Sequence, residues 1–67
     1  MQIEYSVVSK CPNGQYDVEV GYILSLKEAS RVARDFKDNY PDKQIEIWKD
    51  TIKTETIKIY KPTLGKI

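Results

Sequence analysis

The chain contains no histidine and a single cysteine, and both absences narrow the chemistry open to it. Without an imidazole there is no His-ligated metal site and no Cys–His nucleophile pair. The lone thiol of Cys11 cannot form a disulfide within the chain and fits a reducing compartment, so we expect a cytoplasmic protein. The longest strictly apolar runs are pairs such as Val7-Val8, and nothing in the sequence predicts a membrane span.

Glycine is also scarce, and positive and negative charges nearly balance. Lys+Arg 11 against Asp+Glu 10 leave a formal net charge of +1, which argues against a generally basic nucleic-acid coat. The three glycines are isolated, so no glycine-rich phosphate loop occurs, and neither does a calcium loop or a Cys-x-x-Cys zinc pair. We therefore predict no metal site, no cofactor and no catalytic residues, and we expect that the protein is not an enzyme.

What is present suits one small globular domain. The chain has 67 residues, of which 40% are apolar and 31% are charged, and this mixture argues against disorder. We predict a single domain over residues 1–61, ending near Pro62, and a C-terminal tail over residues 62–67.

Two segments before the middle of the chain alternate in the manner of half-buried strands, over residues 3–9 and 15–22. Pro12-Asn-Gly14 lies between them and predicts a hairpin turn, with a longer loop or a bulge at Gly14. The side chains expected to face the core are Ile3, Tyr5, Val7, Tyr16, Val18, Val20 and Tyr22.

A helix is predicted next. Ser25 and Glu28 have the spacing of a capping box, which places the start of the helix at this point. Pro41 disfavours a helical conformation at the residue before it, so the helix is expected to end near Asn39. One apolar stripe at helical spacing is formed by Leu26, Ala29, Val32, Ala33, Phe36 and Tyr40.

A second hairpin follows the helix. Ile45 and Ile47 alternate with polar residues in the third strand, as do Ile57 and Ile59 in the fourth, and all four are expected to face the helix. The reversal between these strands lies within residues 50–55, which contain neither glycine nor proline.

The resulting β-β-α-β-β order predicts an α+β fold. We expect a four-stranded antiparallel sheet of strand order 2-1-3-4, because antiparallel pairs are the commoner kind and a right-handed crossover allows this order. The helix then packs on one face of the sheet and leaves the other face open.

The open face is the predicted partner-binding surface, because acidic residues and an apolar spot are expected to share it. The candidate partner-binding residues are Glu4, Val8, Asp17, Glu19, Glu46, Trp48 and Tyr60. An exposed Trp48 would anchor a protein contact. The alternative is that Trp48 lies in the core, with the register shifted by one residue. The acidic residues have a second interpretation as well, as a solvated face.

Lysine is concentrated near the C-terminus. Residues 49–67 hold five lysines against Asp50 and Glu55. A lysine-rich last strand is typical of a sheet edge that is protected from aggregation. The alternative is a phosphate-binding role.

The arrangement resembles that of short proteins of phages and mobile elements. The residues that carry the resemblance are the hairpin from Tyr5 through Pro12-Asn-Gly to Val20, the capped Ser25-Leu-Lys-Glu-Ala and the Tyr40-Pro-Asp before the third strand. Several anti-CRISPR proteins pair a small antiparallel sheet with one helix and act by occupying a host protein's surface. The resemblance covers the arrangement of residues 3–61 and carries over no functional residue. Housekeeping domains also have this arrangement, and this origin of the chain is left equally open.

The function predicted from these features is that of a non-catalytic protein-binding module. The resemblance implies a phage-type inhibitor that occupies a basic surface of a host protein, such as a nucleic-acid-binding effector. One alternative is a small RNA- or single-stranded-DNA-binding domain that uses Trp48, Tyr60 and the C-terminal lysines, although the acidic residues argue against it. Another is a structural self-associating domain. We also expect a homodimer through a spot formed by Val8, Trp48 and Tyr60.

Overall fold

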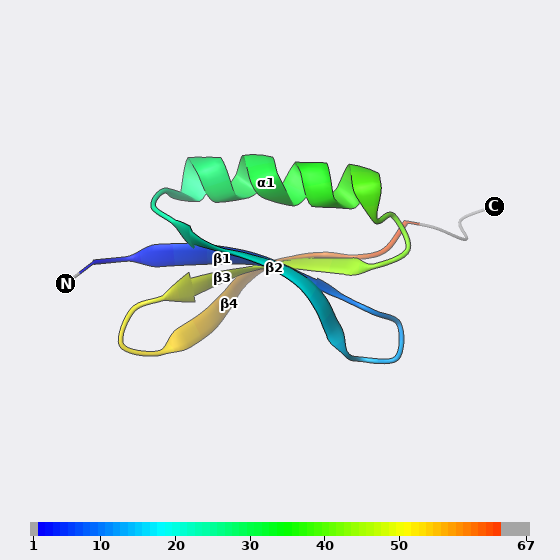
Figure 1. Cartoon of the computed structure of the whole chain (residues 1–67), viewed down its shortest axis with the longest axis horizontal. Coiled ribbons are helices and arrows are strands. Elements are labelled where there is room, and N and C mark those ends of the chain that lie inside the picture. The colour runs from blue at the N-terminus through cyan, green and yellow to red at the C-terminus, as the bar shows by residue number, and fades with distance from the viewer. Residues whose placement is uncertain (1, 64–67) are drawn as a thin grey trace.

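One helix lies across one face of a four-stranded antiparallel sheet in the computed structural model, which describes residues 2–63 (Figure 1). The strand order is β2-β1-β3-β4, so the predicted fold class and strand order are confirmed. The elements are β1 (Glu4–Lys10), β2 (Tyr16–Ile23), α1 (Leu26–Asn39), β3 (Gln44–Asp50) and β4 (Thr54–Tyr60). Of the predicted tail, residues 64–67 lie outside the described part.

The ends of α1 are fixed by local hydrogen bonds. At the N-terminus the Ser25 side chain accepts a hydrogen bond of 3.1 Å from the backbone N–H of Glu28. At the C-terminus the backbone N–H of Tyr40 donates to the Phe36 carbonyl at 2.7 Å, and Pro41 follows. The helix therefore begins and ends where the capping and proline signals predict.

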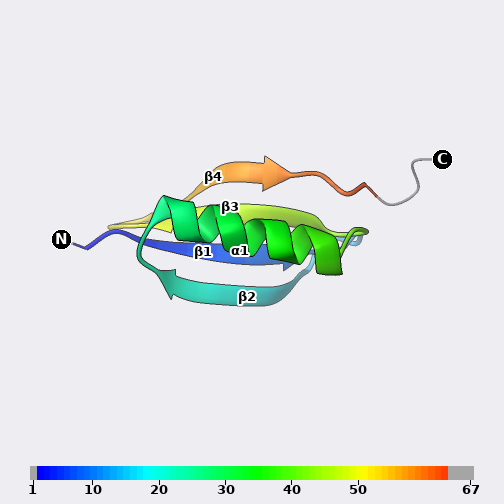
Figure 2. The same cartoon turned by 90° about the horizontal axis from the view of Figure 1, so that it is seen from above.

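The core lies between α1 and the two central strands. Figure 2 shows α1 above β1 and β3, with β2 and β4 as the outer strands. Small side chains, Ala29 and Ala33, form part of the buried helix surface and allow the backbone to approach the sheet. The buried core residues are Val7, Ile23, Ala29, Ala33, Phe36, Ile45 and Ile47.

A β-bulge near the end of β2 reverses the expected direction of one side chain. Tyr5 pairs with Ile23 while Val7 pairs with Val20, so β2 contains one more residue than β1 over this stretch. Tyr22 adopts a φ of 60° at this bulge and its side chain is 85% exposed. The prediction that Tyr22 faces the core is therefore wrong.

A second irregularity at the start of β2 moves Tyr16 as well. Val8 pairs with Glu19 and Lys10 pairs with Tyr16, which again leaves an extra residue in β2. Directly paired residues of antiparallel strands share a face. Tyr16 therefore lies with Val8 and Lys10 on the face away from the helix, and its predicted inward position is wrong.

The pairing of β3 with β4 also contains a bulge. Ile47 pairs with Lys58, whereas the next residue of β3, Trp48, pairs with Thr56. Ile57 is therefore the extra residue, and the alternation of side chains in β4 changes at this point.

The bulge reverses the faces predicted for the end of β4. Tyr60 pairs with Ile45 and packs against the core on the helix side, while Ile59 pairs with Glu46 on the other side. The predictions that Tyr60 lies on the open face and that Ile59 faces the helix are both wrong.

The sheet is strongly twisted, and its two hairpins bend away from α1 at opposite ends of the molecule (Figure 1). After β4 the chain returns toward the loop that follows α1, where the backbone N–H of Thr63 donates to the Pro41 carbonyl at 3.0 Å. This contact ties the chain beyond β4 to the helix end of the fold.

Phe36→Ala is predicted to unfold most of the protein. Phe36 is 8% exposed and makes an edge-to-face contact with Tyr40, with ring centroids 5.8 Å apart. Its truncation in a core lowers the free energy of unfolding by about 3–5 kcal/mol, which is about the total that a domain of this size achieves. The check is urea unfolding followed by circular dichroism. Leu26→Ala, at an exposed position of the same helix, is the control and should lose less than ~1 kcal/mol.

Tyr22→Gly is predicted to stabilise the fold. The left-handed conformation costs a non-glycine residue about 1–2 kcal/mol, and glycine avoids this cost at an entropic penalty of about 0.5–1 kcal/mol. A net gain of about 0.5–1 kcal/mol is expected in urea unfolding. Tyr22→Ala removes the same ring and keeps the strained backbone, so an equal gain in that variant would contradict the explanation.

Candidate partner-binding surface

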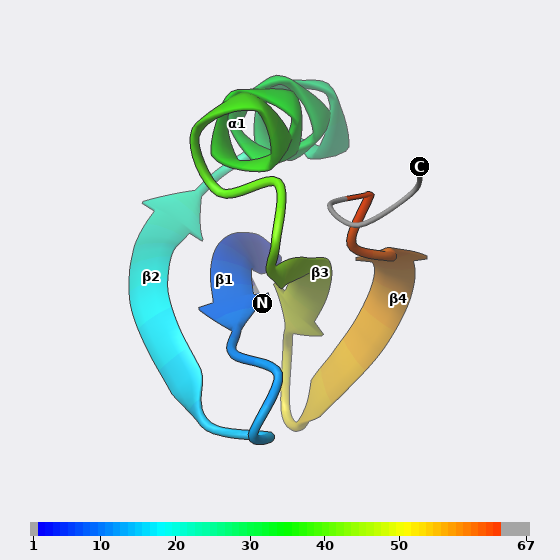
Figure 3. The ribbon, with the colours of Figure 1, turned by 90° about the vertical axis from the view of Figure 1, so that its right-hand side faces the viewer.

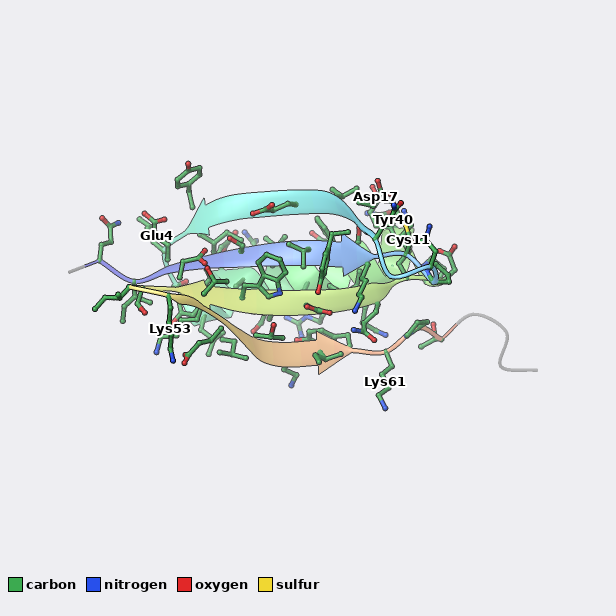
Figure 4. The ribbon with its side chains drawn as sticks, turned by 90° about the horizontal axis from the view of Figure 1, so that it is seen from below. Glu4, Cys11, Asp17, Tyr40, Lys53 and Lys61 are labelled. Carbon is green, nitrogen blue, oxygen red and sulfur yellow. The ribbon has the colours of Figure 1, made fainter. Side chains whose placement is uncertain are left out.

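The face of the sheet away from α1 is the open face, and Figure 4 shows it from below. Its members follow from the strand pairing, because paired residues share a face. They are Glu4, Ser6, Val8, Lys10, Tyr16, Glu19, Gln44, Glu46, Trp48, Asp50, Thr54, Thr56 and Ile59. Although no helix within residues 2–63 covers this face, three of its residues are almost fully buried: Ser6, Val8 and Glu46.

Glu46 is the centre of the open face. It lies on the central strand β3, and only 3% of its surface is exposed. Three side chains donate hydrogen bonds to its carboxylate: Gln44 Nε2 at 2.8 Å, Trp48 Nε1 at 2.9 Å and the Tyr16 hydroxyl at 3.2 Å. A buried carboxylate is expensive unless such donors satisfy it, so Glu46 fixes the positions of all three neighbours.

The donors also determine the protonation of this site. Burial acts to raise the pKa of Glu46, but the hydrogen bonds from Trp48, Gln44 and Tyr16 and the charge of Lys10 outweigh it and lower the pKa below its usual value. Burial, followed by the charge and hydrogen bond of Glu46, raises the pKa of Tyr16. At neutral pH the pair is therefore a carboxylate and a neutral phenol, which suits a structural role better than proton transfer.

An aromatic pair stands beside Glu46. The rings of Tyr16 and Trp48 meet edge to face, with centroids 5.2 Å apart and an interplanar angle of 75°. Lys10 Nζ lies 5.4 Å from the centre of the Tyr16 ring. Tyr16 is 49% exposed and Trp48 is half-buried, so the aromatic pair presents a surface to solvent while its polar atoms are held by Glu46.

Next to the aromatic pair along the sheet is an acidic depression of about 460 Å³. It is lined by Glu4, Ser6, Glu19, Gly21, Tyr22 and Asp50. Ser6 Oγ donates to one oxygen of Asp50 at 3.0 Å and Thr54 Oγ1 donates to the other at 2.9 Å. Hydroxyl groups thus orient this carboxylate, and the lining includes no basic side chain.

The structure brings together four of the seven predicted binding residues. Glu46 and Trp48 belong to the hydrogen-bonded centre, while Glu4 and Glu19 line the acidic depression. Trp48 lies on the open face and not in the core, because it pairs with Ser6 of β1 and donates to Glu46.

Val8 and Tyr60 do not form the expected apolar spot. Val8 is on the open face but only 1% exposed, and Tyr60 lies on the helix side. The predicted dimer contact through Val8, Trp48 and Tyr60 is therefore wrong, because these three side chains do not share an exposed surface.

Asp17 does not join the other carboxylates of the open face. It forms an ion pair with Lys43, in the loop after α1, and the ammonium of Lys43 lies 4.9 Å from the centre of the Tyr40 ring. Figure 4 shows Asp17 beside Tyr40 and Cys11 at one end of the molecule and Glu4 at the other. Its predicted role as part of a shared acidic surface is wrong.

Some residues of the surface were missed by reasoning from the sequence. The spacing of Gln44, Glu46 and Trp48 is a signal that was available, because residues two apart on a strand share a face and can form hydrogen bonds. Tyr16 gave no such signal, because only the bulge in β2 brings it to the open face. Asp50 was assigned to the turn and is in fact the last residue of β3.

Within residues 2–63 no helix is long and apolar enough to cross a membrane. The same residues include no group of three or more acidic, cysteine or histidine side chains placed to hold a metal ion. No family model, curated protein or solved structure matches the chain. Its function is therefore inferred from the open face itself.

Glu46→Gln is predicted to lower stability and to flatten its dependence on pH. Hydrogen bonds to a charged group contribute about 1.5–3 kcal/mol each, and the amide disturbs this donor set, so we expect a loss of about 2–3 kcal/mol at pH 7. The pKa of Glu46 is lowered by folding, so its contribution is complete above the unfolded value of about 4.3 and is lost as pH falls through the folded value.

Urea unfolding at pH 7, pH 5 and pH 3 checks this expectation. The wild type should lose more stability on acidification than Glu46→Gln does. Glu19→Gln, at an exposed carboxylate of the same face, serves as the control and should resemble the wild type. Equal losses on acidification in the wild type and Glu46→Gln would contradict the assigned role of the carboxylate.

Proposed function

We propose that the protein is a non-catalytic binding module whose open face binds a partner protein with a basic surface. The observation that carries the proposal is the placement of the aromatic pair and the acidic depression side by side on the one sheet face that no helix covers. Aromatic side chains are typical anchors of protein interfaces, and complementary charges around them supply specificity and speed of association.

The rigidity of the aromatic pair supports a binding role. Trp48 is held through its Nε1 and Tyr16 through its hydroxyl, both by the same buried carboxylate of Glu46. Side chains that are already fixed lose little conformational entropy when a partner docks on them. The hydrogen-bonded centre thus keeps the surface in one shape before binding.

The charge of the surface supports a basic partner. Glu4, Glu19 and Asp50 line the acidic depression without a basic side chain among them. A lysine or arginine of a partner would find three carboxylates there. A nucleic acid would bring its phosphates against the same three groups, and this repulsion disfavours the RNA- or DNA-binding alternative.

We extend the proposal to inhibition of the phage type. A surface of carboxylates beside aromatic rings is complementary to a protein groove that binds phosphates, so a module of this kind blocks such a groove by occupying it. The likeness of the arrangement to anti-CRISPR proteins supports this form of action, and the lone Cys11 supports a cytoplasmic setting.

The test is affinity capture from a lysate of the source cells with immobilised wild type and charge-reversed variants. Glu4→Lys combined with Glu19→Lys reverses two carboxylates of the acidic depression and should lose the captured protein, with binding at least tenfold weaker in a follow-up titration. Asp35→Lys combined with Asp38→Lys changes the net charge equally at exposed positions of α1 and should bind as the wild type does.

A salt titration with single-stranded oligonucleotides completes the experiment. The proposal expects no binding at physiological salt. Steeply salt-dependent binding to oligonucleotides would favour the nucleic-acid alternative instead. Capture that survives the Glu4 and Glu19 reversal but is lost in the Asp35 and Asp38 control would place the partner on the helix face and overturn the assignment.

A further inference from the structure

Most of the outer strand β4 is left uncovered by the rest of the described fold. Figure 3 shows α1 above β2, β1 and β3, with β4 standing to one side, and all residues from Thr54 to Ile59 are exposed. Within residues 2–63, β4 is hydrogen-bonded to β3, Tyr60 at its end packs against the core, and the outer edge of β4 has no strand partner. We propose that a second copy of this chain pairs with β4 edge to edge, in antiparallel orientation, and joins the two sheets into one.

β4 is better suited to such pairing than the other edge. An unpaired strand edge presents backbone N–H and C=O groups that another strand can bond. β2 carries two bulges, and bulges twist an edge away from new partners, whereas β4 carries one. β2 is also packed against α1 and continues directly toward it.

The bulge in β4 places two opposite charges on the same face. Glu55 pairs with Lys49, and Lys58 pairs with Ile47, which lies two residues from Lys49 on the regular strand β3. Glu55 and Lys58 therefore both lie on the helix side, although they are three positions apart in the sequence. In a regular strand, residues three positions apart point to opposite sides.

Within one copy Glu55 forms an exposed ion pair with Lys53 at 3.6 Å, and Lys58 Nζ lies 5.4 Å from the centre of the Tyr60 ring. One two-fold register brings Glu55 and Lys58 of two copies together. When Glu55 of one copy stands opposite Lys58 of the other, symmetry places the first copy's Lys58 opposite the second copy's Glu55. In the same register Thr54 stands opposite Ile59, and both belong to the open face. Faces and charges thus agree across the pair.

Lys58 favours this register over the alternatives. A shift that places Lys58 opposite its own copy brings like charges together, and so does a shift that places Glu55 opposite its own copy. A lysine on an edge strand therefore prevents general aggregation and still permits the one partner that offers a carboxylate at the matching position. This partner is a second copy of the chain.

Sedimentation equilibrium of the wild type, Glu55→Lys, Lys58→Glu and the double variant tests the proposal. We expect a wild-type dimer with a dissociation constant on the order of micromolar, the weak affinity of a small interface. Each single variant should weaken the homodimer about tenfold, because both symmetric pairs become repulsive. The double variant should restore it. A mixture of the two single variants should form a heterodimer that neither forms alone.

Lys61→Glu is the matched control, since it changes the charge by the same amount beyond the end of β4. It should not weaken the wild-type dimer, and it should pair with Glu55→Lys more weakly than Lys58→Glu does, because one of the two charge pairs stays repulsive. Circular dichroism of each variant confirms that the exposed substitutions leave the fold intact. A wild type that stays monomeric up to about 0.5 mM overturns the proposal, and so does a dimer that neither single variant weakens or that the double variant fails to restore.

Discussion

A buried carboxylate on the uncovered side of the sheet is the constraint on which the surface of this molecule depends. Glu46 is almost fully removed from solvent and stays charged because Gln44, Trp48 and Tyr16 donate to it. Each donor must come from a defined place: two lie on β3 itself and one comes from β2, beyond β1. The carboxylate therefore links β2 to β3 by side chains across β1, which pairs with both of them through its backbone.

The bulges of the sheet serve this arrangement. A regular β2 would place Tyr16 on the helix side, because Tyr16 and Val18 are separated by the interval at which residues share a face. β2 has one extra residue between Tyr16 and Glu19, opposite the stretch from Val8 to Lys10 of β1. This places Tyr16 on the open face, while Val18 still packs against the core. The bulge interrupts the hydrogen-bond ladder between β1 and β2, but it lets Tyr16 donate to the buried carboxylate of Glu46. An unsatisfied buried charge costs more free energy than the interrupted ladder does.

How much of this could be predicted from the sequence depends on whether a feature is local. The capped helix and the proline that ends it follow from signals within a few residues of one another, and the structure agrees with them. The strand order followed from a general preference for antiparallel pairs, and the structure agrees with it as well. The faces of Tyr16, Tyr22 and Tyr60 do not, because one inserted residue reverses every later side chain of a strand. No residue type marks these bulges: Gly21 lies next to one, yet Tyr22 takes the positive φ.

The same limit applies to the candidate site. The open-face positions predicted for Glu4 and Trp48 agree with the structure because β1 and β3 pair regularly. Glu19 agrees because it lies in the part of β2 between the two bulges, whereas Asp17 lies in the irregular start of β2 and bonds to Lys43 instead. Burial of Val8 and Glu46 on a face without a helix could not be foreseen, because it results from side chains of three strands that cover one another.

The position of β1 beside β3 has a consequence for how the chain folds. These central strands pair from Glu4 with Asp50 to Lys10 with Gln44. Their contacts join segments that are far apart in the sequence, because β2 and α1 lie between β1 and β3 along the chain. Long-range pairing of this kind must close a large loop before any of its bonds can form, which slows folding and makes it cooperative. On a ribosome, β1, β2 and α1 therefore wait without a complete core until β3 has emerged, and the two hairpins become stable together or not at all.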